Sequence, residues 1–222
     1  MTFTAGLYGL LGVGVGVLLS LAGRRLVHTH ITPHDRRATL DLRRTTMWLA
    51  CASGAGFAGL WLRYGPSLPT LIVSAYFSVF LLILVLDLAY RWVPNMLLIP
   101  TTVFVLIVST LTGQPSLLNS LAGGMTGFAW FYLIAIAYRG ALGAGDVKLA
   151  GVIGLITGFP GVLTALTIGI LTGGIVAAAL LLSGRVTRKS YIPYAPFLVA
   201  GALVSLVFGT QISEGFASIS GL

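Results

Sequence analysis

At residues 141–148 the chain reads Ala-Leu-Gly-Ala-Gly-Asp-Val-Lys, and this stretch sets an acid, Asp146, at the edge of segments that are otherwise almost wholly apolar. Of the 5 carboxylates in the chain, only Asp146 and Asp87 adjoin long hydrophobic runs. An ionisable group at membrane depth costs about 2.5 to 3.5 kcal/mol on insertion scales, so it usually marks a functional site with a partner. Asp87 and Asp146 are therefore the candidates for chemistry, each as the partner of the other.

The composition of the chain excludes a soluble globule. The chain has 222 residues, of which 57% are hydrophobic and 8% charged, and its mean hydropathy is +0.99. Ordinary domains are about a quarter charged. The 29 glycines fit a membrane protein, because small residues allow helices to approach closely in lipid. The pairs Gly123/Gly127 and Gly169/Gly173 have the spacing for such contacts.

Apolar runs long enough to cross a bilayer predict an all-α, polytopic membrane protein with about eight transmembrane helices, forming a single domain over residues 1–222. The run at 147–158 is short, since about 12 residues at a rise of 1.5 Å span about 18 Å of a core of about 30 Å. The predicted spans lie near 5–22, 46–62, 70–86, 96–113, 119–138, 147–158, 161–183 and 193–212.

The distribution of basic residues predicts the orientation of these spans. If every span crosses and the amino terminus lies outside, all but one of the 13 Lys and Arg residues lie in or beside cytoplasmic loops, and only Arg63 lies outside. This pattern satisfies the positive-inside rule, and it requires the short run 147–158 to cross. The same orientation places Asp87 and Asp146 at the cytoplasmic ends of their spans.

The loop at 23–45 is the only sizeable polar segment, and it is short and basic. Its histidines, His28, His30 and His34, form a weak metal pattern, and a solvated basic loop is the favoured interpretation. Cys51 is the only cysteine, which excludes a disulfide or a multi-thiolate zinc site within the chain. The net charge of +8 is explained by cytoplasmic loops, so no nucleic-acid partner is expected. No bound metal and no cofactor are expected either.

Two carboxylates at one membrane face can share a proton, because like charges a few ångströms apart do not both ionise. The ionised acid then activates water while the protonated acid polarises a carbonyl group. Gly143 and Gly145 lack a Cβ and would let backbone or an extended substrate approach Asp146. The alternative roles are structural: Asp146 can cap the helix that follows, and Asp87 can be a solvated helix end.

Three segments resemble the motifs of type IV prepilin leader peptidases. The segment 87–95, Asp-Leu-Ala-Tyr-Arg-Trp-Val-Pro-Asn, resembles the first aspartate motif, in which Ile/Val-Pro-Asn/Asp follows the acid; the segment 143–149, Gly-Ala-Gly-Asp-Val-Lys-Leu, resembles the Gly-x-Gly-Asp motif. The segment 191–197, Tyr-Ile-Pro-Tyr-Ala-Pro-Phe, resembles the last-span motif. Together with the span count, the resemblance covers roughly residues 70–212. Besides the two acids, the residues that carry it are Pro94, Asn95, Gly143, Gly145, Lys148, Pro193 and Pro196.

The resemblance implies an all-helical membrane aspartic endopeptidase of the inner membrane, with Asp87 and Asp146 as its catalytic pair facing the cytoplasm. The implied substrates are prepilins or pseudopilins, which have a basic leader and a hydrophobic helix, and the other partner is membrane lipid. Many members carry a larger, cysteine-rich domain in the first loop and also methylate the new amino terminus. The short loop 23–45 lacks these cysteines, so we expect cleavage without methylation and no zinc.

Other functions remain open from the sequence. A proton-coupled transporter also places acids in a membrane, but near its midplane, and a non-catalytic scaffold of a secretion apparatus would tolerate neutral residues at both acids. A presenilin-like protease shares Gly-x-Gly-Asp but not the other two motifs. The sequence does not identify the pilin that is cleaved or the oligomeric state.

Overall fold

The computed structural model describes residues 2–30, 42–137, 142–184 and 194–220. Within these residues the chain forms helices and no strands, and one helix corresponds to each of the predicted spans. The predicted all-α fold is therefore confirmed. The helices are α1 (Thr2–His30), α2 (Leu42–Tyr64), α3 (Leu68–Tyr90), α4 (Asn95–Thr112), α5 (Leu117–Ala137), α6 (Ala144–Thr157), α7 (Gly161–Leu182) and α8 (Ala195–Ser220).

Length and composition make several helices membrane spans. Among the described residues, the 5 helices α1, α3, α4, α5 and α7 are long and apolar enough to cross a bilayer, and α8 contains a shorter apolar helix, Ala195–Gly209. α6 has 14 residues, and at a rise of 1.5 Å it is about 21 Å long, which is short for a hydrocarbon core of about 30 Å. The chain is a multi-pass membrane protein.

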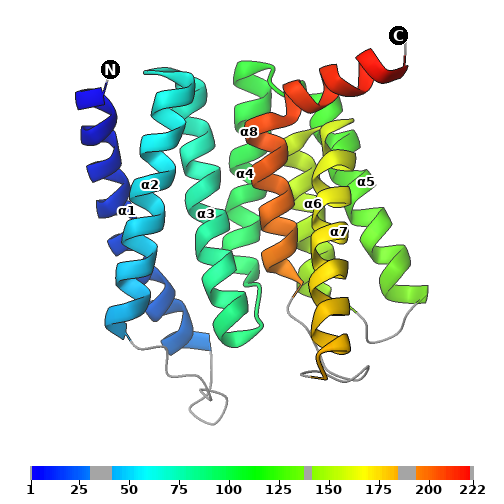
Figure 1. The fold of residues 1–222 in the computed structure, drawn as a ribbon, viewed down its shortest axis with the longest axis horizontal. Coiled ribbons are helices and arrows are strands. Elements are labelled where there is room, and N and C mark those ends of the chain that lie inside the picture. The colour runs from blue at the N-terminus through cyan, green and yellow to red at the C-terminus, as the bar shows by residue number, and fades with distance from the viewer. Residues whose placement is uncertain (1, 31–41, 138–141, 185–193, 221–222) are drawn as a thin grey trace. The chain divides into compact units, whose positions relative to one another are not determined.

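The helices form two compact units, residues 1–91 and 92–222 (Figure 1). In the first unit α1 packs along α2, and α3 contacts both. Tyr8 of α1 ties the three helices together: its hydroxyl donates to Ser74 Oγ of α3 at 3.1 Å, and its ring stacks on Phe57 of α2 at 5.3 Å. A buried hydroxyl with an acceptor avoids the penalty of an unpaired polar group in an apolar core.

The second unit is built around α6, which contacts α4, α5, α7 and α8. From Leu149 to Ile156 its residues are apolar or glycine on every face, and Leu149, Ala150 and Ile153 are fully buried. A helix that is hydrophobic on every face belongs in the interior of a bundle. This central position explains how a helix too short to span lipid comfortably is accommodated: other helices surround it for most of its length. Asp146 lies in its first turn.

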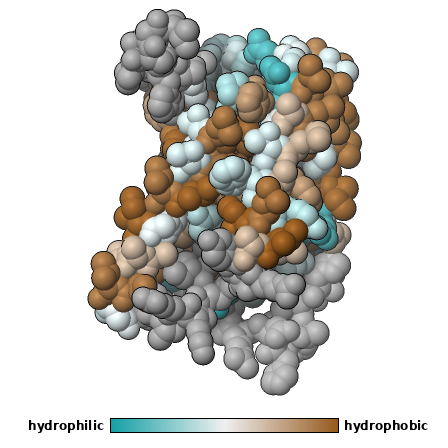
Figure 2. Space-filling view, turned by 90° about the vertical axis from the view of Figure 1, so that its right-hand side faces the viewer, coloured by the Kyte–Doolittle hydropathy of each residue, from teal (hydrophilic) through white to brown (hydrophobic). Residues whose placement is uncertain are grey.

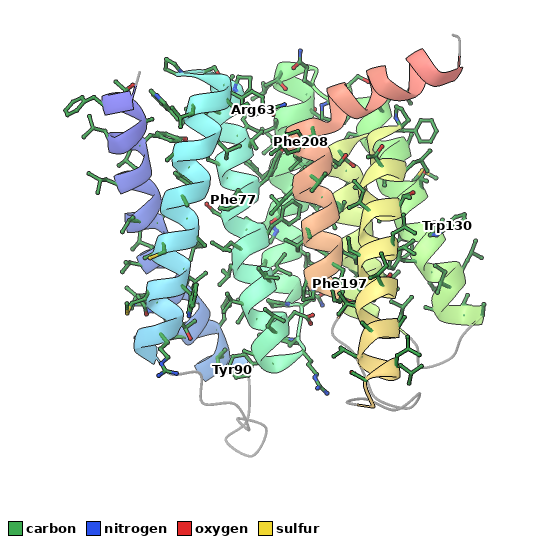
Figure 3. All side chains as sticks on the ribbon, in the orientation of Figure 1. Arg63, Phe77, Tyr90, Trp130, Phe197 and Phe208 are labelled. Atoms are coloured by element: carbon green, nitrogen blue, oxygen red, sulfur yellow. The ribbon has the colours of Figure 1, made fainter. Side chains whose placement is uncertain are left out.

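Glycines set the closest helix contacts of this unit. A Cβ at Gly123 would collide with the carbonyl oxygen of Gly154, so α5 and α6 touch backbone to backbone. A Cβ at Gly169 of α7 would lie 3.1 Å from the carbonyl oxygen of Phe197 in α8, and Figure 3 shows Phe197 beside α7. Gly127 faces the backbone of Ala150 in α6, and Gly173 faces the rings of Tyr194 and Phe197. Both predicted glycine pairs therefore lie at helix interfaces.

Large apolar side chains cover much of the outer surface. On α5 alone, Leu118 is 77% exposed and Met125 is 73% exposed, and Figure 3 shows Trp130 on the outer side of the same helix. Figure 2 shows brown and pale residues over most of the coloured part of one face, with hydrophilic residues confined to small areas. A surface of this kind is a liability in water and fits contact with lipid.

Candidate active site

Asp146 caps the helix on which it lies. Gly143 is the N-cap residue of α6, with φ −75° and ψ 146°. The Asp146 N–H donates to the Gly143 carbonyl oxygen at 3.0 Å, and the Gly143 N–H donates to Asp146 Oδ2 at 3.3 Å. The structural role predicted for Asp146 is therefore confirmed. It does not exclude a chemical role, because the cap engages one oxygen of the carboxylate through one long hydrogen bond.

The surroundings of Asp146 favour its protonated form. The side chain is only 3% exposed, and it precedes the predicted span 147–158. Burial raises the pKa of the Asp146 carboxyl above its ordinary value, and the hydrogen bond from the Gly143 backbone offsets part of this rise. A carboxyl that retains its proton at higher pH suits a pair of acids that share one proton.

The structure brings the Val-Pro-Asn segment onto the start of α6. A Cβ at Gly145 would lie 3.0 Å from Val93 Cβ, so these two residues are in direct contact. Lys148 Nζ donates to Asn95 Oδ1 at 3.1 Å, across 53 positions of the sequence. The Val93 side chain thus occupies the space that a Cβ at Gly145 would take, a contact that differs from the approach of backbone or substrate predicted from the sequence.

Between these two contacts Pro94 fixes the start of α4. It is the N-cap residue of that helix, with φ −75° and ψ 130°, and it is buried. Proline has a fixed φ and no N–H to satisfy, so it is well suited to the point where an extended segment turns into a helix. The Val-Pro-Asn segment thus has a defined conformation and two contacts with α6.

The last-span motif also lies close to Asp146. Tyr194 directly precedes α8, and its hydroxyl donates to the carbonyl oxygen of Ile170 at 3.5 Å. Its ring centroid is 6.1 Å from that of Phe131. Tyr194 also interacts electrostatically with Asp146. From the sequence, this tyrosine was part of the last-span motif, but nothing associated it with Asp146. Pro196 follows in the first turn of α8, and Pro193 lies outside the described residues.

Asp87 lies near the carboxyl end of α3 and is 3% exposed. Its carbonyl oxygen accepts a hydrogen bond from the N–H of Arg91 at 2.8 Å, and Arg91 ends the helix with a left-handed φ of 52°. A buried side chain does not fit the alternative of a solvated helix end. Asp87 belongs to the first compact unit and Asp146 to the second, so the pairing of the two acids stays a prediction.

The sequence also offered a weak metal pattern in His28, His30 and His34. Their side chains lie outside the described part of the chain. The pattern stays untested. Among the described side chains, no group of three or more His, Cys, Asp and Glu residues lies together.

Comparison with known proteins finds a family that resembles part of this chain. Residues 74–178, which include both acids, match the family described as the type IV leader peptidase family. The chain is 30% identical over 156 residues to the "Prepilin leader peptidase/N-methyltransferase" of Bacillus subtilis (strain 168), an alignment that covers 70% of this chain and 63% of the relative. It is 28% identical over 164 residues to the protein of the same name from Burkholderia pseudomallei (strain 1026b), covering 72% of this chain and 53% of the relative.

The chain therefore spans between about half and two thirds of the length of these relatives. No solved structure matches it. The family match, the relatives and the motif residues that meet at the start of α6 agree with one another: over residues 74–178, this chain is similar to the type IV leader peptidase family.

Proposed function

We propose that the chain is a membrane aspartic endopeptidase that removes the basic leader of a prepilin or pseudopilin at the cytoplasmic face of the inner membrane. The observation that carries this proposal is the family match over residues 74–178, because both candidate acids lie inside it. The names of the relatives describe prepilin leader peptidases. The contacts of Val93 with Gly145 and of Asn95 with Lys148 add support, since residues of two separate motifs meet.

Chain connectivity supports the pairing of Asp87 with Asp146. Asp87 precedes Val93 by six residues, and an extended chain of that length spans at most about 20 Å. Val93 itself contacts Gly145, the neighbour of Asp146. The covalent chain therefore limits how far Asp87 can lie from the start of α6, and we propose that the two acids pair there.

The proposed reaction uses the two acids without a metal or a covalent intermediate. The ionised acid takes a proton from water, whose oxygen attacks the scissile carbonyl carbon, while the protonated acid donates its proton to the carbonyl oxygen. The resulting tetrahedral intermediate has two hydroxyl groups. As it collapses, the C–N bond breaks, the proton taken from water passes from the first acid to the departing amine, and one hydroxyl returns a proton to the second acid as the C=O bond forms again. The products are a leader with a new carboxyl group and a pilin with a new amino terminus.

The protonation state of Asp146 fits this scheme. Its burial favours the neutral carboxyl, and the Gly143 hydrogen bond holds the side chain in a fixed orientation. Pre-orientation of a group that must donate or accept a proton lowers the cost of reaching the transition state.

The test is co-expression of this chain with candidate prepilins from the same genome in a host without its own prepilin peptidase. We expect loss of the leader, read as a mass change of the pilin, only when the chain is present. Intact leaders on every candidate prepilin, with the chain accumulating in the membrane, would contradict the proposal.

A further inference from the structure

A cavity of about 540 Å³ opens on the surface of the second unit between α4, α5 and α6. We call it the α4–α6 groove. Its lining comes from residues of Asn95–Thr102 on α4, Leu121–Phe128 on α5 and Lys148–Leu155 on α6. Apart from Asn95, Thr102 and Lys148, the lining residues are apolar or glycine.

The groove has one polar end and an apolar body. Lys148 and Asn95 are hydrogen-bonded to each other at 3.1 Å, and both lie at the starts of their helices, α6 and α4. The floor of the groove, from Lys148 to Leu155, is about 10 Å long, measured along the axis of α6. In the predicted orientation the starts of α4 and α6 are cytoplasmic, so the groove begins at the cytoplasmic face and descends into the apolar layer.

We propose that the α4–α6 groove binds the first turns of the prepilin's hydrophobic helix, the part that directly follows the scissile bond. This inference rests on the proposed function and adds the substrate-binding surface to it. A helix whose apolar side chains insert into a groove of 300–1,000 Å³ is a common mode of recognition. The exposed part of the groove is apolar on both walls, with Ile99 from α4 and Met125 from α5.

Continuity with Asp146 is the first argument for this occupant. Lys148, at the polar end of the groove, follows Asp146 by two residues on α6. Two residues spaced i and i+2 do not share a helix face, so Asp146 lies beside the groove and does not line it. A substrate helix in the groove would reach Asp146 through an extended segment of about three residues, or about 10 Å, around the start of α6. A bilayer lipid has no part that must reach this acid.

Charge is the second argument. The Lys148 ammonium group lies at the mouth of the groove, and its hydrogen-bond acceptor, the Asn95 amide, is neutral. A like charge repels a basic segment, by an amount that grows as the surroundings become less polar. The Lys148 charge therefore disfavours entry of the basic leader into the groove, so the leader would stay outside it on the cytoplasmic side, while the apolar body accepts the helix itself.

Filling the groove tests the proposal. Thr102 lines the groove, and its neighbour Val103 is 50% exposed on α4 without lining it. We expect Thr102→Trp to raise the KM for full-length prepilin about tenfold or more with little change in kcat, because it removes binding common to ground and transition states. Val103→Trp, the matched control, should leave both constants within about twofold of wild type.

Cross-linking identifies the occupant. A benzophenone maleimide is attached to Met125→Cys or, as the control on the same helix, to Leu133→Cys, which is exposed but outside the groove. Both variants carry Cys51→Ala, and Asp146→Asn prevents turnover. We expect adducts between position 125 and the first turns of the prepilin helix, and few adducts from position 133.

The outcomes separate the two proposals. If the wild-type chain cleaves no prepilin, the proposed function fails. If it cleaves prepilin but Thr102→Trp and Val103→Trp behave alike, or if position 125 forms adducts with lipid alone, the groove is not the substrate site although the peptidase assignment stands.

Discussion

Val93 contacts Gly145 so closely that a Cβ at position 145 would lie 3.0 Å from the Val93 Cβ. The contact joins the segment that follows one candidate acid, Asp87, to the helix that carries the other, Asp146. A second contact, from Lys148 Nζ to Asn95 Oδ1, lies one helical turn further on. Together they make the start of α6 the place where two of the three motifs meet.

The acids are the first subject for mutation. We predict that Asp87→Asn and Asp146→Asn each abolish leader cleavage while the chain still accumulates in the membrane, because an amide neither activates water nor donates an acidic proton. At position 146 the asparagine side-chain oxygen can still accept from Gly143, so the cost to folding should stay below about 1 kcal/mol. Pilin mass and chain abundance are the measurements.

Glu214→Gln makes the same chemical change at an acid outside the motifs and serves as the control. Cleavage of a true substrate at near the wild-type rate by either Asp variant would rule out the dyad.

The Val93 contact predicts an effect at Gly145. We expect Gly145→Ala to lower kcat by about tenfold, because the new methyl group displaces the Val93–Asn95 segment by a few tenths of an ångström and misplaces the groups around it. The control is Gly174→Ala, at a helical glycine with nothing within 4 Å of the added Cβ. Equal rates for the two variants in a prepilin cleavage assay would show that the contact has no part in catalysis.

The interface of α5 and α6 predicts an effect on stability. A Cβ at Gly154 would overlap the backbone of Gly123, so Gly154→Ala must separate the two helices. Overpacking of this kind typically costs about 1–3 kcal/mol. We expect a lower thermal unfolding temperature in detergent than for Gly174→Ala, followed by tryptophan fluorescence. An unchanged unfolding temperature would mean that the helices pack differently.

The charge distribution predicts topology. In a Cys51→Ala background, a cysteine at Ser190 should resist an impermeant maleimide added from outside, because the basic loop 184–192 is expected in the cytoplasm. Arg63→Cys lies in the last turn of α2, which is expected outside, so it should react readily and serves as the control that the reagent reaches that surface. Ready labelling at position 190 would show that the short helix α6 does not carry the chain across.

The loop 23–45 predicts that cleavage occurs without methylation. Methyl transfer from S-adenosylmethionine needs a pocket for a charged, nucleotide-sized cofactor, typically about 300 Å³ or more with several convergent polar groups. The relatives named above carry N-methyltransferase in their names, and the Bacillus subtilis protein is the positive control. We expect mass spectrometry to find an unmethylated first residue on pilin processed by this chain alone. A methyl group that appears only with this chain would overturn the expectation.

The sequence by itself determined the class of the molecule and the positions of its helices. Apolar runs and turn residues are local signals, and each of the predicted spans corresponds to a helix within the described residues. The spacing of Gly123 with Gly127 and of Gly169 with Gly173 also identified two helix interfaces correctly, because small residues four positions apart form one flat strip on a helix. The motifs around Asp87 and Asp146 predicted the family that residues 74–178 match, since each motif is a short continuous segment.

Only the tertiary structure decided what surrounds these motifs. That α6 is the centre of the second unit, that Val93 fills the space beside Gly145, and that Tyr194 lies near Asp146 all depend on contacts between distant segments. No local periodicity encodes them. The α4–α6 groove arises in the same way, from the spacing of three helices that meet only after packing. Hydrophobic pattern selects which residues enter the membrane, but close packing selects which of them touch, because every helix here is apolar on most of its faces.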